Sequence, residues 1–149
     1  MPARLMVLNG PNLNLLGVRE PHIYGTTTLA AIETACRDFA GVIGASLVDW
    51  VQAARSTADA IVINPAAYSF RSVALLDALK AFEGPVVEVH ISNIHARDAL
   101  HRHSIISTVA RSVIAGAGPY GYILGMQTAA QMLGALPQSL PASLRSAPK

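Results

Sequence analysis

The sequence predicts an α/β protein in which helices cover both faces of a parallel β-sheet. Short continuous apolar runs, which are typical of strands buried on both faces, recur along the chain. Patterns with one apolar helical face separate these runs, as a parallel sheet with crossover helices requires. The 149 residues suit one domain with one core, and we find no internal repeat and no second-domain boundary.

The first half of the chain alternates between the two patterns. Residues 5–8 form an apolar run that ends in a turn, and residues 12–27 contain the glycines and prolines of a loop. The elements expected next are a helix with Leu29, Ile32, Cys36 and Phe39 on one face, a helix at residues 46–54 and a buried strand at residues 60–64.

The second half repeats the alternation. The expected elements are a helix at residues 72–82 with Val73, Leu75, Leu76 and Leu79 inward, a strand at 85–90, a polar helix at 96–101, a strand at 112–115 and a last helix at 121–133. Residues 137–149 are rich in proline and serine and have no apolar period. We therefore expect one domain over residues 1–136, followed by a mobile tail.

Composition excludes several classes of protein. Hydrophobic residues make up 52% and charged residues 13%, which is too apolar for a disordered chain. The net charge of +2 comes without a Lys/Arg cluster, so we expect no nucleic-acid partner. A single cysteine, Cys36, excludes an internal disulfide and is expected to be a buried, inert thiol. Without a leader peptide or a membrane-spanning run, the expected location is the cytoplasm.

Polar side chains follow three of the expected strands. They are Asn9 and Asn12 after the first, Asn64 after the second, and His90, Ser92 and Asn93 after the third. Each asparagine taken alone is more simply explained as a turn cap. Because parallel strands bind ligands beyond their carboxyl ends, the set together favours a site for a small, oxygen-rich ligand.

Two other kinds of site are disfavoured. The glycine-rich residues 116–121 precede a helix but lack the Lys-Ser/Thr pair of a phosphate loop, so we interpret them as a tight strand-to-helix turn. Four histidines lie within residues 90–103, but His101 and His103 point to different sides of a helix. No His-Glu-x-x-His pattern accompanies them, so we expect no metal.

Three long motifs resemble those of the type II 3-dehydroquinate dehydratases. Residues 8–25 carry LNGPNLNLLG followed by Arg19 and Tyr24, residues 63–79 begin with INPAAYS, and residues 87–95 read VEVHISNIH. The likeness spans roughly residues 5–133, and the motifs occur in the family's order. It implies a flavodoxin-like three-layer fold assembled as a trimer-based dodecamer. It also implies dehydration of 3-dehydroquinate to 3-dehydroshikimate without a cofactor, metal or covalent intermediate.

The resemblance also assigns roles to residues. Tyr24 matches the base, Arg19 and Arg97 the cations that favour its phenolate, Asn12 the residue holding a water against the enolate oxygen, and His90 the acid. Glu88 lies two residues before His90 on the same strand face and would orient it. The positions that match substrate-binding residues are Asn64, Asp77 from a neighbouring subunit, Ile91, Ser92, Arg97 and His101. A Schiff-base mechanism is disfavoured, because Lys80 and Lys149 are the only lysines.

The chain departs from the family pattern at four places. Residues 41–46 replace a strand and polar loop, so we expect four main strands with the edge strand missing or short. Phe70 stands in place of a substrate-binding histidine, His101 in place of a binding arginine, and Ile105 in place of a tyrosine. A neutral imidazole cannot reproduce a guanidinium fork.

These departures leave alternatives open. The first hypothesis is a dehydratase that is weakened or has a shifted substrate. A catalytically silent relative that binds a cyclic acid, or only assembles, is the second hypothesis. A nucleotide- or flavin-binding module is the third, and the missing phosphate loop disfavours it.

Overall fold

A parallel sheet runs through the computed structural model, which describes residues 3–10, 13, 16, 21–42, 46–47, 51–137 and 139–145. Its strands are β1 (Arg4–Asn9), β2 (Ser46–Leu47), β3 (Ala60–Asn64), β4 (Val86–His90) and β5 (Ser112–Ala115). They are all parallel and lie in the order β2-β1-β3-β4-β5, which is the flavodoxin-like order. The predicted α/β class is confirmed.

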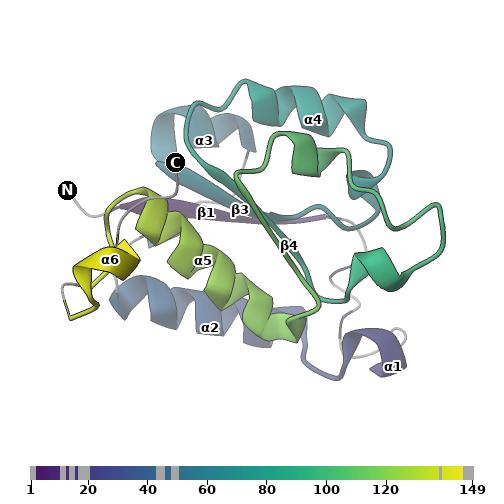
Figure 1. Ribbon diagram of the computed structural model, residues 1–149, viewed down its shortest axis with the longest axis horizontal. Coiled ribbons are helices and arrows are strands. Elements are labelled where there is room, and N and C mark those ends of the chain that lie inside the picture. The colour runs from purple at the N-terminus through teal and green to yellow at the C-terminus, as the bar shows by residue number, and fades with distance from the viewer. Residues whose placement is uncertain are drawn as a thin grey trace.

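Helices cover both faces of this sheet. They are α1 (Pro21–Tyr24), α2 (Leu29–Val42), α3 (Val51–Thr57), α4 (Val73–Lys80), α5 (Gly121–Met132) and α6 (Ala142–Arg145). Figure 1 shows α3 and α4 on one side of the strands and α2 and α5 on the other. Hydroxyl caps begin two of them, since Thr28 Oγ1 accepts from the Ala31 amide and Ser72 Oγ from the Leu75 amide.

The core consists of two apolar layers separated by the sheet. Alternate strand residues feed them, with Leu5, Val62 and Val89 in the layer under α2 and α5, and Met6 and Ile61 in the layer under α3 and α4. Cys36 lies in the first layer and is 2% exposed. Its burial raises the pKa of the thiol to about 11, in agreement with the inert thiol that we expected.

Helix α5 approaches the sheet at a glycine. A Cβ built at Gly125 would lie 2.9 Å from methyl carbons of Val62 and Val89, so the helix axis can come this close only without a side chain there. The approach also buries Tyr122, one turn earlier, which is 0% exposed. Through this tyrosine, α5 reaches the carboxyl ends of the strands.

The helix predicted at residues 46–54 is wrong in its first part. Ser46 and Leu47 instead pair in parallel with Arg4 and Leu5, and α3 begins at Val51. The pairing satisfies backbone groups on the open side of β1, which outweighs a helix-like spacing of apolar residues. Residues 43–45 and 48–50 lie outside the described residues, so the full length of this edge strand stays a prediction.

The polar helix predicted at residues 96–101 is also wrong. The segment contains a 3₁₀ turn, η3 (Ile94–Ala96), which ends where Arg97 adopts an extended backbone with ψ of 178°. Asp98 then accepts a hydrogen bond from the Leu100 amide, and such local side-chain bonds compete with helix formation.

Two further expectations concern single elements. Val73 was expected to face inward but is 60% exposed, because it lies about a third of a turn away from the face formed by Leu75, Leu76 and Leu79. Within the expected tail, residues 142–145 form α6, and the Gln131 side chain donates to the Leu144 carbonyl. The tail's mobility stays a prediction.

Candidate functional site

Three strands end in polar residues at one edge of the sheet. Asn9 and Asn64 are directly paired at the ends of β1 and β3, and His90 ends the adjacent strand β4. Asn64 is 3% and His90 4% exposed, so both side chains are held by their surroundings. The convergence that the sequence predicts is therefore present for these three residues.

A buried tyrosine fixes the two asparagines. Tyr122 Oη donates to Asn9 Oδ1 at 2.6 Å and accepts from Asn64 Nδ2 at 3.0 Å. Asn64 Oδ1 in turn accepts from the Ala66 amide at 3.3 Å. Both ends of the Asn64 amide are thus assigned, which sets the orientation of this side chain. Burial raises the pKa of the Tyr122 phenol above its ordinary value, so it remains a neutral donor at physiological pH.

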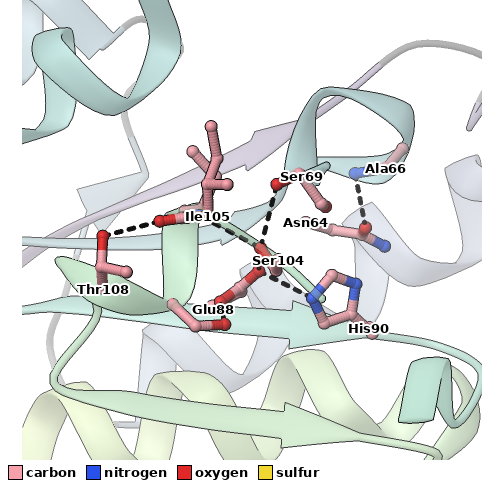
Figure 2. A network of polar contacts seen from close by, with 10 residues as sticks. Asn64, Ala66, Ser69, Glu88, His90, Ser104, Ile105 and Thr108 are labelled. Atoms are coloured by element: carbon pink, nitrogen blue, oxygen red, sulfur yellow. Dashed lines mark hydrogen bonds and ion pairs between the residues drawn. The ribbon is translucent and has the colours of Figure 1, made fainter. Parts of the chain in front are cut away.

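His90 is bound to a buried carboxylate. Its Nε2 lies 2.8 Å from Glu88 Oε1, and Glu88 is 0% exposed. The predicted contact between these two residues is present and visible in Figure 2. Because an ionised carboxylate only accepts hydrogen bonds, Nε2 carries the proton on this side of the ring.

Two serines complete the surroundings of this carboxylate. Ser104 Oγ, just before the 3₁₀ turn η4 (Ile106–Thr108), donates to Glu88 Oε1, and Ser107 Oγ, within that turn, donates to Glu88 Oε2. Burial alone raises the pKa of the Glu88 carboxyl. The bonds from His90 and both serines more than offset burial, and the net effect is a pKa below the ordinary value. Glu88 is therefore a buried anion at neutral pH.

The loop after β4 is held by backbone hydrogen bonds from the glycine-rich segment that follows β5. The Gly116 amide donates to the His90 carbonyl at 3.1 Å, and the Gly118 amide donates to the Ile91 carbonyl at 3.0 Å. Gly116 has φ of +83°, and an added Cβ would lie 3.2 Å from Asn93. The glycine-rich segment is therefore the tight strand-to-helix turn that we expected, and it fixes the backbone of Ile91 and Ser92 at the edge of the sheet.

Tyr24 is brought to Arg97. Arg97 Nη2 donates to the phenol oxygen of Tyr24, and its guanidinium carbon lies 5.3 Å from the centroid of the tyrosine ring. Tyr24 ends α1 and Arg97 follows η3, so the contact joins segments that are far apart in sequence. In Figure 1, α1 lies beyond the end of β4 on the same side as η3. The expected pairing of these two residues is present.

The residues at two of the departures from the family pattern contact each other. The rings of Phe70 and His101 meet edge to face, with centroids 5.2 Å apart and an interplanar angle of 88°. His101 Nδ1 lies 2.8 Å from Asp98 Oδ2, and this bond lowers the pKa of the Asp98 carboxyl. The His101 side chain is 48% exposed, so the pair forms a rim and not a buried part of the site.

One expected site residue lies on a helix away from the strand ends, and two others lie outside the described residues. Asp77 is an exposed residue of α4 whose carboxylate lies 3.6 Å from Lys80 Nζ. Asp77 was expected to contribute to the site of a neighbouring subunit. Asn12 and Arg19 lie outside the described residues. No cluster of metal-ligating side chains occurs in the part of the chain that the structure describes, and no helix there is long and apolar enough to span a membrane.

The sequence did not point to Ser104, Ser107 or Tyr122. The two serines lie in a polar segment without periodicity, and only the fold brings them to Glu88. Tyr122 carried a weak signal, since a tyrosine on the apolar face of a helix usually needs a partner for its hydroxyl.

Comparison with known proteins gives one consistent result. Residues 3–130 match the family model "Dehydroquinase class II". The chain is 50% identical over 145 residues to the "3-dehydroquinate dehydratase" of Streptomyces coelicolor, with 89% of this chain and 92% of that protein covered. It is 48% identical over 138 residues to "Catabolic 3-dehydroquinase 1" of Aspergillus terreus, at coverages of 85% and 91%.

A solved structure agrees with these sequence matches. The type II dehydroquinase of Propionibacterium acnes superposes with a TM-score of 0.78 and is 38% identical, covering 87% of this chain and 97% of that one. Fold and site thus define a parallel α/β protein with a buried carboxylate–imidazole pair at the carboxyl edge of its sheet. More specifically, the chain belongs to the class II dehydroquinase family.

Proposed function

We propose that this chain is a 3-dehydroquinate dehydratase, a hydro-lyase that forms 3-dehydroshikimate and water in the shikimate or quinate pathway. The observation that carries the proposal is the arrangement of two pairs at one end of the sheet: His90 bound to the buried Glu88, and Tyr24 bound to Arg97. Relatives with that name share about half of their residues with this chain over most of its length. The reaction needs a base and an acid, and the two pairs provide one of each.

Tyr24 is the base in this proposal. Its phenol oxygen removes a proton from the carbon next to the ketone, and the electrons of the C–H bond form an enolate. Arg97 donates to that oxygen, which orients it and offsets negative charge on it. Arg19 would add a second cation, and Asn12 would hold a water against the enolate oxygen. A preorganised donor of that kind contributes on the order of 3 kcal/mol.

His90 is the acid. As the enolate collapses, the carbon–oxygen bond breaks and the hydroxyl leaves as water with a proton from the imidazole. Because Nε2 faces Glu88, the proton transferred to the leaving group is the one on Nδ1. The imidazole keeps its Nε2 proton throughout, and Glu88 offsets the positive charge before transfer. The route uses an anti elimination and requires no metal or cofactor.

The substrate is held by the surrounding polar groups. We assign the carboxylate to the backbone amides of Ile91 and Ser92, and the ring hydroxyls to Asn64, Arg97 and His101. Asp77 would reach the site from a neighbouring subunit, in agreement with its exposed position on α4. We accordingly propose a trimer-based dodecamer in the cytoplasm.

A second candidate is a weakened or silent relative that binds a related cyclic acid. The Phe70–His101 contact favours it, because an apolar ring and an imidazole paired with Asp98 occupy positions matched to a histidine and an arginine. This arrangement offers fewer donors to a ring hydroxyl, and each lost hydrogen bond lowers affinity by roughly 1 kcal/mol.

Ultraviolet absorbance separates the two candidates, since the product is a conjugated enone and the substrate is not. We expect absorbance to rise after mixing with 3-dehydroquinate, and Tyr24→Phe to lower the rate at least about 100-fold. Tyr120→Phe, at a tyrosine that is 59% exposed, is the matched control and should keep full activity. Absence of any signal at high enzyme concentration contradicts the dehydratase, and full activity of Tyr24→Phe contradicts its role as base.

A further inference from the structure

The Glu88 carboxylate is fully enclosed, and each of its oxygens has its own donor. Oε1 receives His90 Nε2 at 2.8 Å and the Ser104 hydroxyl, and Oε2 receives the Ser107 hydroxyl. A buried carboxylate without such partners would lose its charge. Because donors hold both oxygens, the carboxylate cannot rotate away from the imidazole.

The serines are themselves held in place by the backbone. The Ile105 amide donates to the Ser69 carbonyl at 2.8 Å, which ties the segment to the 3₁₀ turn Ala66–Ser69 that follows β3 (Figure 2). Ser104 Oγ accepts from the Ile106 amide at 3.2 Å. It also lies 3.3 Å from the Ser69 carbonyl, but its single proton goes to the much nearer carboxylate. The two hydroxyls are therefore preorganised toward Glu88.

We propose that Ser104 and Ser107 are positioning residues that keep Glu88 ionised and aimed at Nε2 of His90. The inference rests on the proposed function insofar as it concerns turnover. Neither serine touches the reacting atoms. They act through Glu88 on the imidazole, and their effect is to direct the transferable proton to Nδ1, on the side of the ring away from Glu88.

The surroundings of Glu88 restrict what can titrate there. Within the described residues, the neighbouring strands place Ile63 and Val113 beside it, and both are uncharged. His90 is the described group whose charge acts on the carboxylate, while the two serines act through hydrogen bonds. Removal of a serine donor therefore acts on Glu88 directly and on His90 through it.

Ser107→Ala is the sharper of the two tests, because Ser104 also supports the Ile106 amide. Loss of a donor to a carboxylate raises its pKa, and protonation of Glu88 removes the anion that pairs with the His90 imidazole. The acidic limb of kcat against pH should therefore move to higher pH in Ser107→Ala, so that kcat falls more on the acidic side than near neutrality. KM should change by less than about twofold, because Ser107 makes no substrate contact in the proposal.

The chain offers a matched control and a rescue. Thr108, the next residue of η4, donates to the Ile105 carbonyl at 2.7 Å, and its hydroxyl points away from Glu88 (Figure 2). Thr108→Ala should leave the acidic limb of kcat at the same pH as in the wild type. Ser107→Thr keeps the hydroxyl and should restore it, and Ser107→Cys, a weak donor, should give an intermediate shift. The cysteine variant also serves if the alanine variant does not fold.

A measurement without substrate separates this inference from the proposed function. In protein labelled with ¹³C-glutamate, the infrared band of a protonated carboxyl that is missing from Glu88→Gln reports the titration of Glu88. We expect this band to appear at higher pH in Ser107→Ala than in wild type or Thr108→Ala. An unchanged band, or an unmoved kinetic limb, overturns the inference even in an active enzyme. If the band shifts in Ser107→Ala but the wild-type protein shows no turnover, the positioning role is supported and the dehydratase is overturned.

Discussion

Tyr122 tests whether the two asparagines are held in place by α5. Tyr122→Phe removes the hydroxyl that joins Asn9 and Asn64 and leaves the rest of the buried ring unchanged. Asn64 Nδ2 then loses its acceptor in a position that is 3% exposed, and an unsatisfied buried donor costs about 1–3 kcal/mol. Loss of the bond to Asn9 adds about 1 kcal/mol, so we expect destabilisation of about 3 kcal/mol in total.

This magnitude is large enough to measure in two ways. For a chain of this length, about 3 kcal/mol lowers Tm by about 6–12 °C. Urea unfolding at a fixed protein concentration gives the free energy itself, and the concentration must be fixed because assembly contributes to apparent stability. We also expect KM for 3-dehydroquinate to rise severalfold with a smaller change in kcat, since the Asn64 amide loses its fixed orientation.

Tyr120→Phe is the control, because it removes the same hydroxyl two residues earlier from a ring that is 59% exposed. Exposed substitutions of this kind change stability by less than about 0.5 kcal/mol. If the two variants differ by less than that amount, the hydroxyl of Tyr122 does not hold the site together. Unchanged KM in a clearly destabilised Tyr122→Phe would show that Asn64 is not a binding residue.

Three further changes probe the rim, the core and the surface. Phe70→His should lower KM in the absorbance assay by supplying a donor at the rim. An unchanged or higher KM would show that residue 70 does not contact the substrate. Gly125→Ala forces a Cβ to within 2.9 Å of two buried valine methyl carbons and should cost about 2 kcal/mol in urea unfolding. Asp59→Asn removes a half-exposed ion pair with Arg4, 3.1 Å apart, and should cost less than about 1 kcal/mol at pH 7. Because the Arg4 bonds hold the pKa of Asp59 below its ordinary value, this contribution is present above about pH 4 and should vanish as pH falls through the folded-state pKa.

The sheet was predictable because its strands are enclosed. β3 and β4 are buried along their whole length: β3 is a continuous apolar run before Asn64, and β4 is apolar apart from Glu88 before His90. Where strands end in this way, the edge that carries the site is visible in the sequence itself. Glu88 within β4 was equally informative, since a carboxylate two residues before an imidazole lies on the same strand face.

What could not be predicted depends on tertiary contacts or on local competition. The turn at Asp98 replaces an expected helix because one side chain binds the backbone two residues on. Ser107 reaches Glu88 across 19 positions and Arg97 reaches Tyr24 across 73, and no local pattern encodes such distances. The meeting of Phe70 with His101 is of the same kind, since each appeared as a separate departure.

The location of those departures bears on whether the chemistry persists. Glu88 and His90 lie in a network where removal of one member leaves the others without a hydrogen-bond partner, so a change there would cost both stability and function. The His101 side chain is 48% exposed and, among the described residues, it bonds to Asp98 and meets the edge of Phe70, so a change there costs little in folding. At Phe70 and His101, the sequence therefore departs from the family pattern where substitution is inexpensive for stability. This argues for altered affinity at the rim around an intact acid, and it predicts that the departures act more on KM than on kcat.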